Sequence, residues 1–96
     1  MKAFPFMRPV AGKTCLIVGG GEVALRKAEK LYPFGVRLLV CAPECADFSA
    51  FGANVLREKY RPQLLEGIDL AVAATDDKAL NARVAGDCRD RRSGRA

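Results

Sequence analysis

Histidine is absent from the 96 residues of this sequence, and long hydrophobic runs are absent too. Without histidine there is no Ser-His or Cys-His pair, and no Gly-x-Ser-x-Gly motif occurs. The sequence therefore lacks the residues that nucleophilic acyl transfer usually needs. No apolar stretch approaches the roughly 20 residues that a membrane-spanning helix needs. The first six residues also lack the apolar core and cleavage site of a secretory signal. We therefore expect a soluble, cytoplasmic protein that does not bind a membrane.

Cysteine is present, but in no pattern that favours a metal site or a redox centre. The four cysteines contain no Cys-x-x-Cys spacing, and Cys15 and Cys41 belong to or border predicted buried strands, where cysteine acts as a small hydrophobe. Cys41 and Cys45 are close enough in sequence to share a metal, but the chain offers no histidine and no second cysteine pair. We expect reduced thiols and no metal.

The length and composition suit one small globular domain. The chain is 50% hydrophobic and 28% charged, and it is short for a dinucleotide fold of six strands. We assign residues 1–90 to this domain and residues 91–96 to a disordered basic tail. The net charge is +5, of which five arginines and two aspartates from Arg83 onward supply +3, leaving +2 for the rest. A tail of this kind, without interleaved aromatics, favours a solvated helix end over nucleic-acid binding.

The most informative segment is an apolar run that ends at three glycines. Residues 14–18 read as a fully buried central strand, and a helix is expected from about Glu22 to Tyr32. Between them stands Gly19-x-Gly21-x-x-Ala24, in which the first glycine permits a tight turn, the second lets the backbone approach a pyrophosphate, and the small third residue lets helix and strand pack closely. The segment predicts a dinucleotide-binding turn with phosphates at the helix N-terminus.

The remaining segments complete a strand and helix alternation. A second strand is expected over 36–41, a short third strand within 54–60, and a small-residue buried strand over 70–74. Thr75-Asp76-Asp77 then reads as a helix N-cap signature before Leu80, Val84 and Cys88 at helical spacing. The order predicts an α/β, Rossmann-like fold with a parallel sheet of about four strands and flanking helices, incomplete at the C-terminus.

Three loops should converge at the carboxyl ends of these strands, where ligands of open parallel sheets bind. We place the pyrophosphate at Gly19 to Val23, which includes Gly20 and Glu22, the adenosine ribose beside Pro43 and Glu44, and the nicotinamide half beside Thr75 and Asp76. Glu44 follows Gly21 by 23 residues, near the spacing expected of a ribose-binding carboxylate, and no arginine follows the second strand at once, so NAD is favoured over NADP. The alternatives are an ordinary exposed loop glutamate, and Thr75 and Asp76 that only cap a helix.

Taken together, these residues resemble the N-terminal part of the siroheme synthase family, the precorrin-2 dehydrogenases that also act as sirohydrochlorin ferrochelatases. The resemblance runs to about Arg89. Its motifs are Phe4-Pro5-Phe6, Cys15 to Ala24 with Arg26-Lys27-Ala28, the segment 35–43, and Ala73-Ala74-Thr75-Asp76-Asp77 with Asn81 and Arg83-Val84-Ala85.

The resemblance implies NAD-dependent oxidation of precorrin-2, a tetrapyrrole rich in carboxylates, to sirohydrochlorin, and iron insertion in bifunctional members. It implies that Glu22 and Val23, with Pro43 and Glu44, contact NAD. The substrate's negative charge suits a basic protein. The family's proposed general base is an aspartate after a further strand that reads roughly Asn-Val-Val-Asp, and this sequence has no such segment. The sequence therefore does not identify the catalytic residue, and Asp76 or another carboxylate of this chain is the candidate.

We expect the chain to be C-terminally truncated relative to this family, without its dimerisation region, and to be a marginally stable fold that binds NAD weakly. Two other functions stay open. One is a non-catalytic module that senses NAD and regulates a partner, although such a module has no need of the Ala-Ala-Thr-Asp-Asp segment. The other is nucleic-acid binding through the Arg89 to Arg95 tail, which strongly salt-dependent DNA binding would support.

Overall fold

A computed structural model of the protein describes residues 12–94. The chain forms four strands and two α-helices in the alternating order that the sequence predicts. The strands are β1 (Thr14–Val18), β2 (Arg37–Cys41), β3 (Asn54–Leu56) and β4 (Leu70–Ala73), and the helices are α1 (Glu22–Leu31) and α2 (Lys78–Gly94). Three short 3₁₀ helices, η1 (Tyr32–Phe34), η2 (Ser49–Phe51) and η3 (Pro62–Leu65), lie in the connections.

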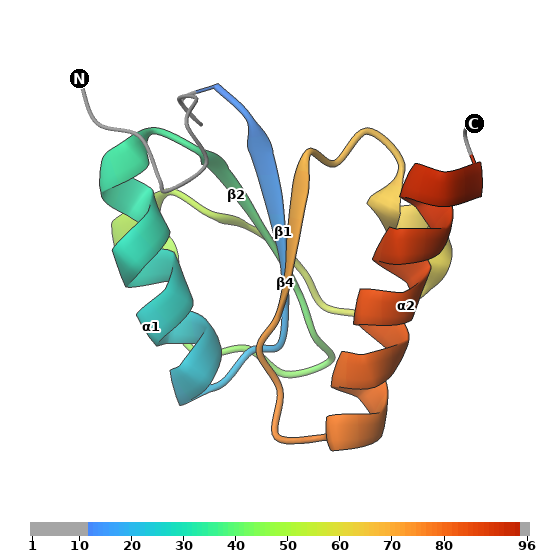
Figure 1. The fold of residues 1–96 in the computed structure, drawn as a ribbon. Coiled ribbons are helices and arrows are strands. Elements are labelled where there is room, and N and C mark those ends of the chain that lie inside the picture. The colour runs from blue at the N-terminus through green and yellow to red at the C-terminus, as the bar shows by residue number, and fades with distance from the viewer. Residues whose placement is uncertain (1–11, 95–96) are drawn as a thin grey trace.

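The four strands make one parallel sheet in the order β3-β2-β1-β4, with β1 inside as expected. Leu16 of β1 pairs with Leu39 of β2 on one side and with Ala71 of β4 on the other. Strands β2 and β3 lie on one side of β1, and β4 lies on the other. The strand order therefore switches between β1 and β4, although all four strands are parallel. The two helices lie on opposite faces of the sheet (Figure 1), so this is a small, doubly wound Rossmann-like arrangement, and the predicted fold class is confirmed.

The central strand divides its side chains between two cores because side chains alternate along a strand. Cys15 and Ile17 point to the α1 side, and Leu16 and Val18 point to the α2 side. All four are at most 1% exposed, as a strand covered on both faces requires. The α1-side core is completed by Ala24, Ala28, Leu31, Val36, Leu38, Val40, Phe48 and Ala74.

The α2-side core ties the β3–β4 connection to the second helix. Val84, at 1% exposure, packs with Tyr60 and Leu65, and Leu80 and Cys88 join it at the helical spacing read from the sequence. The Tyr60 hydroxyl donates a hydrogen bond of 2.7 Å to Oδ2 of Asp87. The guanidinium carbon of Arg83 lies 5.7 Å from the centre of the same ring. Burial, and then the Asp87 hydrogen bond and charge, raise the pKa of Tyr60, so the phenol stays a donor.

Some element boundaries differ from the sequence prediction. The strand β3 covers only part of the predicted segment 54–60, because only three residues pair with β2. The helix α2 includes the backbone of residues 91–94, where the sequence suggests a disordered tail; no proline breaks this arginine-rich segment, and arginine is a good helix former. The Phe4-Pro5-Phe6 lead-in and residues 95–96 lie outside the described residues.

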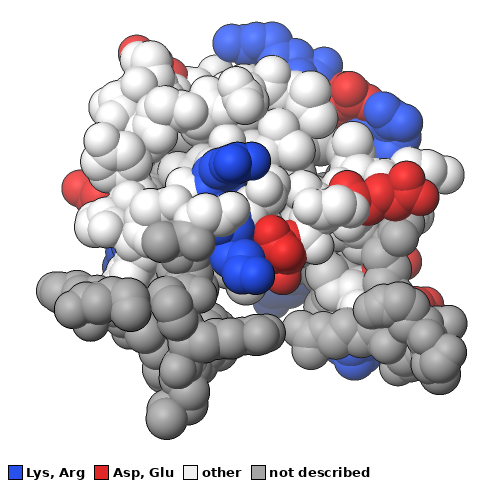
Figure 2. All heavy atoms as spheres, turned by 90° about the horizontal axis from the view of Figure 1, so that it is seen from above, with Lys and Arg blue, Asp and Glu red and all other residues white. Residues whose placement is uncertain are grey.

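Charge of both signs is mixed on the face that Figure 2 shows. The view looks from above onto the amino-terminal edge of the sheet, and lysine or arginine side chains stand beside carboxylates there. No single-sign field gathers on this side, apart from what the grey atoms cover. Within residues 12–94, no helix is both long and apolar enough to cross a membrane.

Replacing Gly86 with alanine should stabilise the fold. Gly86 lies within α2, and a Cβ there would meet only the end of the Arg89 side chain at 3.8 Å, which is an ordinary contact. Removing the backbone freedom of glycine from a helix gains about 0.5–1 kcal/mol. We expect the melting temperature of Gly86→Ala to rise by about 2–8 °C in a thermal scan. A lower melting temperature would show that the alanine methyl is not accommodated.

The buried thiol of Cys15 should make stability depend on pH in the alkaline range. Burial raises its pKa from 9.0 to about 12. The unfolded chain therefore loses this proton first, and stability present below about pH 9 is lost as the pH rises toward 12. We expect Cys15→Ala to be less stable at pH 8 in urea unfolding, and the gap to wild type to narrow by about 1 kcal/mol at pH 10. A gap that stays constant would contradict the raised pKa.

Candidate functional site

The turn after β1 brings the ends of three strands together at Gly19. Its backbone N–H donates to the carbonyl oxygen of Cys41 at 3.0 Å, which joins the turn to the end of β2. A Cβ at Gly19 would overlap the carbonyl group of Ala74 at the end of β4 and would lie 3.3 Å from Cγ2 of Thr75. The φ angle of Gly19 is +138°, which side-chain-bearing residues rarely adopt. Both constraints require glycine here.

The start of α1 leaves backbone donors open beside this turn. Gly21 is the N-cap, no side chain caps the helix, and a Cβ at Gly21 would meet nothing within 4 Å. Within the described residues, the amides of Glu22, Val23 and Ala24 have no hydrogen-bond acceptor, as is usual for the first turn of a helix. Ala24 is fully buried under the sheet, so this small third residue of the motif does allow the close packing that the sequence predicts.

The loop after β2 lies against the second residue of the glycine run. A Cβ at Gly20 would overlap the carbonyl oxygen of Glu44, and the amide of Ala46 donates to the carbonyl oxygen of Gly20 at 2.8 Å. Pro43 and Glu44 themselves are exposed at this turn. The structure therefore brings the loop of the predicted ribose contacts directly beside the predicted phosphate turn, and Glu44 is free to face a ligand.

The turn between β4 and α2 is held by a side-chain clamp. The Thr75 hydroxyl donates to Oδ1 of Asn81 at 2.7 Å and accepts from the Asp77 amide at 3.0 Å. The Asn81 amide group donates to the carbonyl oxygen of Thr75 at 2.9 Å, and its Oδ1 accepts from the Thr75 amide at 3.3 Å. Asp77 caps the helix by accepting from the Leu80 amide at 3.1 Å. Thr75 and Asp77 therefore have the structural role, stabilising the turn and the start of α2, that the sequence analysis gives as the alternative to ligand binding.

Asp76 is different from its neighbours in this turn. Its side chain is exposed and makes no hydrogen bond or ion pair within the part of the chain that the structure describes. The β4–α2 turn lies against the predicted phosphate-binding turn through Gly19, Ala74 and Thr75. Asp76 thus presents a carboxylate at the edge where the order of the strands reverses.

Among the other predicted site residues, Glu22 pairs with Arg26 at 3.2 Å, and both side chains are well exposed. Val23 is 48% exposed, which leaves its side chain accessible beside the open end of α1. The exposed carboxylates of the three loops are Glu22, Glu44, Asp47, Asp76 and Asp77. The exposed charged side chains of these three loops are therefore mainly acidic, and they surround the open amides at the start of α1.

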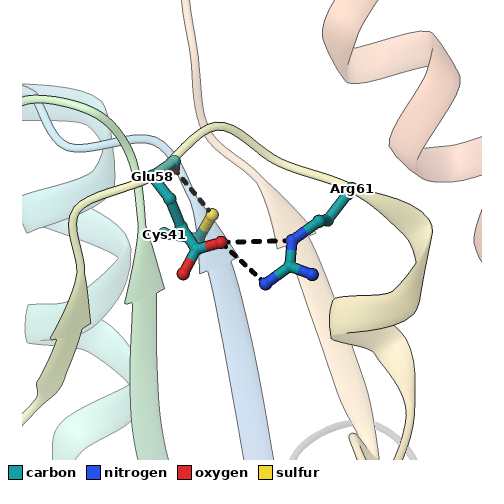
Figure 3. Close-up of polar contacts among 3 residues, drawn as sticks. All are labelled: Cys41, Glu58 and Arg61. Carbon is teal, nitrogen blue, oxygen red and sulfur yellow. Dashed lines mark hydrogen bonds and ion pairs between the residues drawn. The ribbon is translucent and has the colours of Figure 1, made fainter.

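Sequence reasoning did not find the contacts of the loop after β3. The Cys41 thiol, at the end of β2, donates to the carbonyl oxygen of Glu58 at 3.2 Å, and the Glu58 carboxylate binds Arg61 through Nε at 3.1 Å and Nη2 at 2.7 Å (Figure 3). Burial, and then the charge of Glu58, raise the pKa of Cys41, so this thiol stays protonated and structural. No group of three potential metal ligands occurs in residues 12–94.

Comparison with known proteins matches this architecture. Residues 6–93 match a family model described as "Putative NAD(P)-binding". The chain is 47% identical to the siroheme synthase of Chromobacterium violaceum, and this match covers 95% of the chain and 20% of that protein. It is 45% identical to the siroheme synthase of Stutzerimonas stutzeri, and this match covers 88% of the chain and 19% of that protein. It spans about a fifth of the length of these curated relatives.

A solved structure is similar as well. The chain superimposes on a protein described as SirC, precorrin-2 dehydrogenase, with a TM-score of 0.71 and 30% sequence identity, over 82% of this chain and 42% of that one. The resemblance drawn from the glycine run and the Ala-Ala-Thr-Asp-Asp segment is thereby confirmed.

Replacing Gly19 with alanine should damage the site and the fold together. The added Cβ would both strain the backbone at φ +138° and overlap the end of β4. We expect a loss on the order of 3 kcal/mol in denaturant unfolding. Gly67→Ala is the matched control, because Gly67 also has a positive φ, +76°, but open space around it. Its loss should be about 1 kcal/mol. Equal losses would mean that contact with β4 does not constrain Gly19.

Proposed function

The chain belongs to the NAD(P)-binding family, and from that premise we propose that it is the NAD-binding part of a precorrin-2 dehydrogenase that forms sirohydrochlorin for siroheme. The observation that carries the proposal is the convergence of three loops at Gly19, with open helix amides and an exposed Glu44 around it. The similar siroheme synthases and the similar precorrin-2 dehydrogenase supply the substrate class.

The residues present fit a dinucleotide pyrophosphate. The absence of a side chain at Gly21 leaves room for phosphate oxygens at the start of α1. The unpaired amides there would donate to those oxygens, and the positive end of the helix dipole favours the negative charge. Val23 would cover part of the ligand with an apolar surface. When bound, NAD supplies the acceptor for a hydride.

Charge around the loop after β2 favours NAD over NADP. Glu44 would accept hydrogen bonds from the adenosine ribose hydroxyls and repel a 2′-phosphate in their place. From Leu38 to Leu56 the chain contains no lysine or arginine that could neutralise such a phosphate. The preference for NAD therefore depends on the Glu44 carboxylate and on the absence of lysine and arginine from residues 38–56.

Asp76 is the carboxylate that we propose at the nicotinamide half. Its side chain is exposed at the β4–α2 turn, and the Thr75–Asn81 clamp keeps the backbone of that turn in place. A carboxylate in this position would accept a proton from the tetrapyrrole as its hydride leaves. The net charge of +5 belongs to the chain as a whole, and it would favour a substrate rich in carboxylates only outside the acidic side chains of the three loops.

A titration of the full chain with NAD and NADP by calorimetry tests the cofactor, and precorrin-2 oxidation, followed by NADH absorbance, tests the reaction. We expect NAD to bind at least tenfold more tightly than NADP, and Glu44→Gln to narrow this ratio, because the variant loses the charge that repels the 2′-phosphate. Lys27→Gln, on the exposed side of α1, is the control and should leave the ratio unchanged.

The outcomes separate the candidate functions. Turnover that falls in Asp76→Asn while NAD affinity is unchanged supports the catalytic assignment. NAD binding without turnover would overturn the role of Asp76 and leave a cofactor half-site that lacks its catalytic group, which the alternative, a non-catalytic module that senses NAD, also predicts. No binding of either nucleotide would overturn the cofactor proposal.

A further inference from the structure

Gly20 stands at a position that the glycine fingerprint leaves free. The pattern Gly19-x-Gly21-x-x-Ala24 requires small residues at its first, third and sixth positions, and any residue is allowed between the two glycines. The sequence alone thus assigns Gly20 no task beyond its place in the turn. The structure does, because Gly20 is the residue of the turn that lies against the loop carrying Glu44.

The contact leaves no space for a side chain. A Cβ on Gly20 would overlap the carbonyl oxygen of Glu44, and it would lie 2.9 Å from Cα of Cys45 and 3.0 Å from Cβ of Ala42. Two of these three neighbours are backbone atoms, which cannot rotate away as a flexible side chain could. A methyl group at this position can be accommodated only if the loop itself moves.

The loop is fixed at both of its ends, so its position is well defined. The Ala42 amide donates to the carbonyl oxygen of Leu56 at 3.1 Å, which holds the start of the loop to β3. The Ala46 amide donates to Gly20 at 2.8 Å, and Phe48, at 2% exposure, anchors the following residues in the α1-side core. The turn at Glu44 therefore lies against Gly20, and it is held on one side by the Ala42–Leu56 hydrogen bond and on the other by the Ala46–Gly20 hydrogen bond.

We propose that Gly20 is a positioning residue that couples the phosphate turn to the loop of Glu44 and thereby sets the preference for NAD over NADP. The inference rests on the proposed function. Gly20 acts through two backbone contacts, the steric one with the Glu44 carbonyl and the hydrogen bond from the Ala46 amide. A ligand held by the open amides of α1 then finds Glu44 at a distance fixed by the same glycine run.

A double-mutant cycle tests this coupling. We expect Gly20→Ala to weaken NAD binding by about tenfold or more, because a hydrogen bond to a charged group is lost when Glu44 is displaced. NADP binding should weaken less, so the ratio of the two affinities should fall. In a Glu44→Ala background the same alanine should weaken NAD binding by a much smaller factor, because no side-chain acceptor is left at position 44 for Gly20→Ala to displace. A general loss of structure would instead weaken the binding of NAD and of NADP by the same factor.

Gly86→Ala is the matched control, since it makes the same change in α2, away from the three loops, and it should leave both affinities unchanged. Should Gly20→Ala fail to unfold cooperatively, Ala46→Pro removes the other contact, the amide that donates to Gly20, without adding an atom to the glycine run. It too should lower the ratio of NAD to NADP affinity.

Each result has a distinct meaning. An unchanged ratio of the two affinities in the folded variant, or equal factors in the wild-type and Glu44→Ala backgrounds, would overturn the role of Gly20 while leaving the proposed cofactor intact. Failure of the wild-type chain to bind either nucleotide would overturn both proposals together.

Discussion

The close approach of three strand ends at Gly19 is the constraint on which the rest of the molecule depends. Its amide binds the end of β2, and the absence of a side chain lets the end of β4 lie against the same residue. Parallel strands of this kind need both faces covered, and the two cores on either side of β1 provide that cover. Because the sheet is fixed at this point, the loops that follow β1, β2 and β4 meet there.

Much of the fold could be predicted from the sequence because its signals are local. The apolar run of β1, the glycines after it and the spacing of Ala24, Ala28 and Leu31 each report on a few neighbouring residues, and the structure confirms all of them. The small residues of β4 and the cap before α2 are signals of the same kind. The convergence of the loops then follows from the topology of parallel strands and not from any one residue.

The rest could not be predicted because it depends on contacts between distant residues. The side chain of Asn81 reaches back to Thr75, and the carbonyl of Glu58 accepts from Cys41, but neither pair has a spacing that distinguishes it in sequence. The contact between Gly20 and the loop of Glu44 is invisible for the same reason. The sequence does not predict the end of α2, because arginine and aspartate carry no periodic apolar signal, although arginine is a good helix former. The roles of Glu44 and Asp76 stay predictions.

The order of the strands also has a consequence for how the chain folds. Cys15 pairs with Leu38, 23 residues away, but also with Leu70, 55 residues away. Closing the longer loop costs about 0.8 kcal/mol more in chain entropy, so we expect the β1–α1–β2 unit to form before β4 docks on it. The contact of Ala74 with Gly19, in the predicted phosphate-binding turn, would then form last. A nucleotide that contacts all three loops would bind most tightly once β4 has docked, and its binding would stabilise the completed sheet.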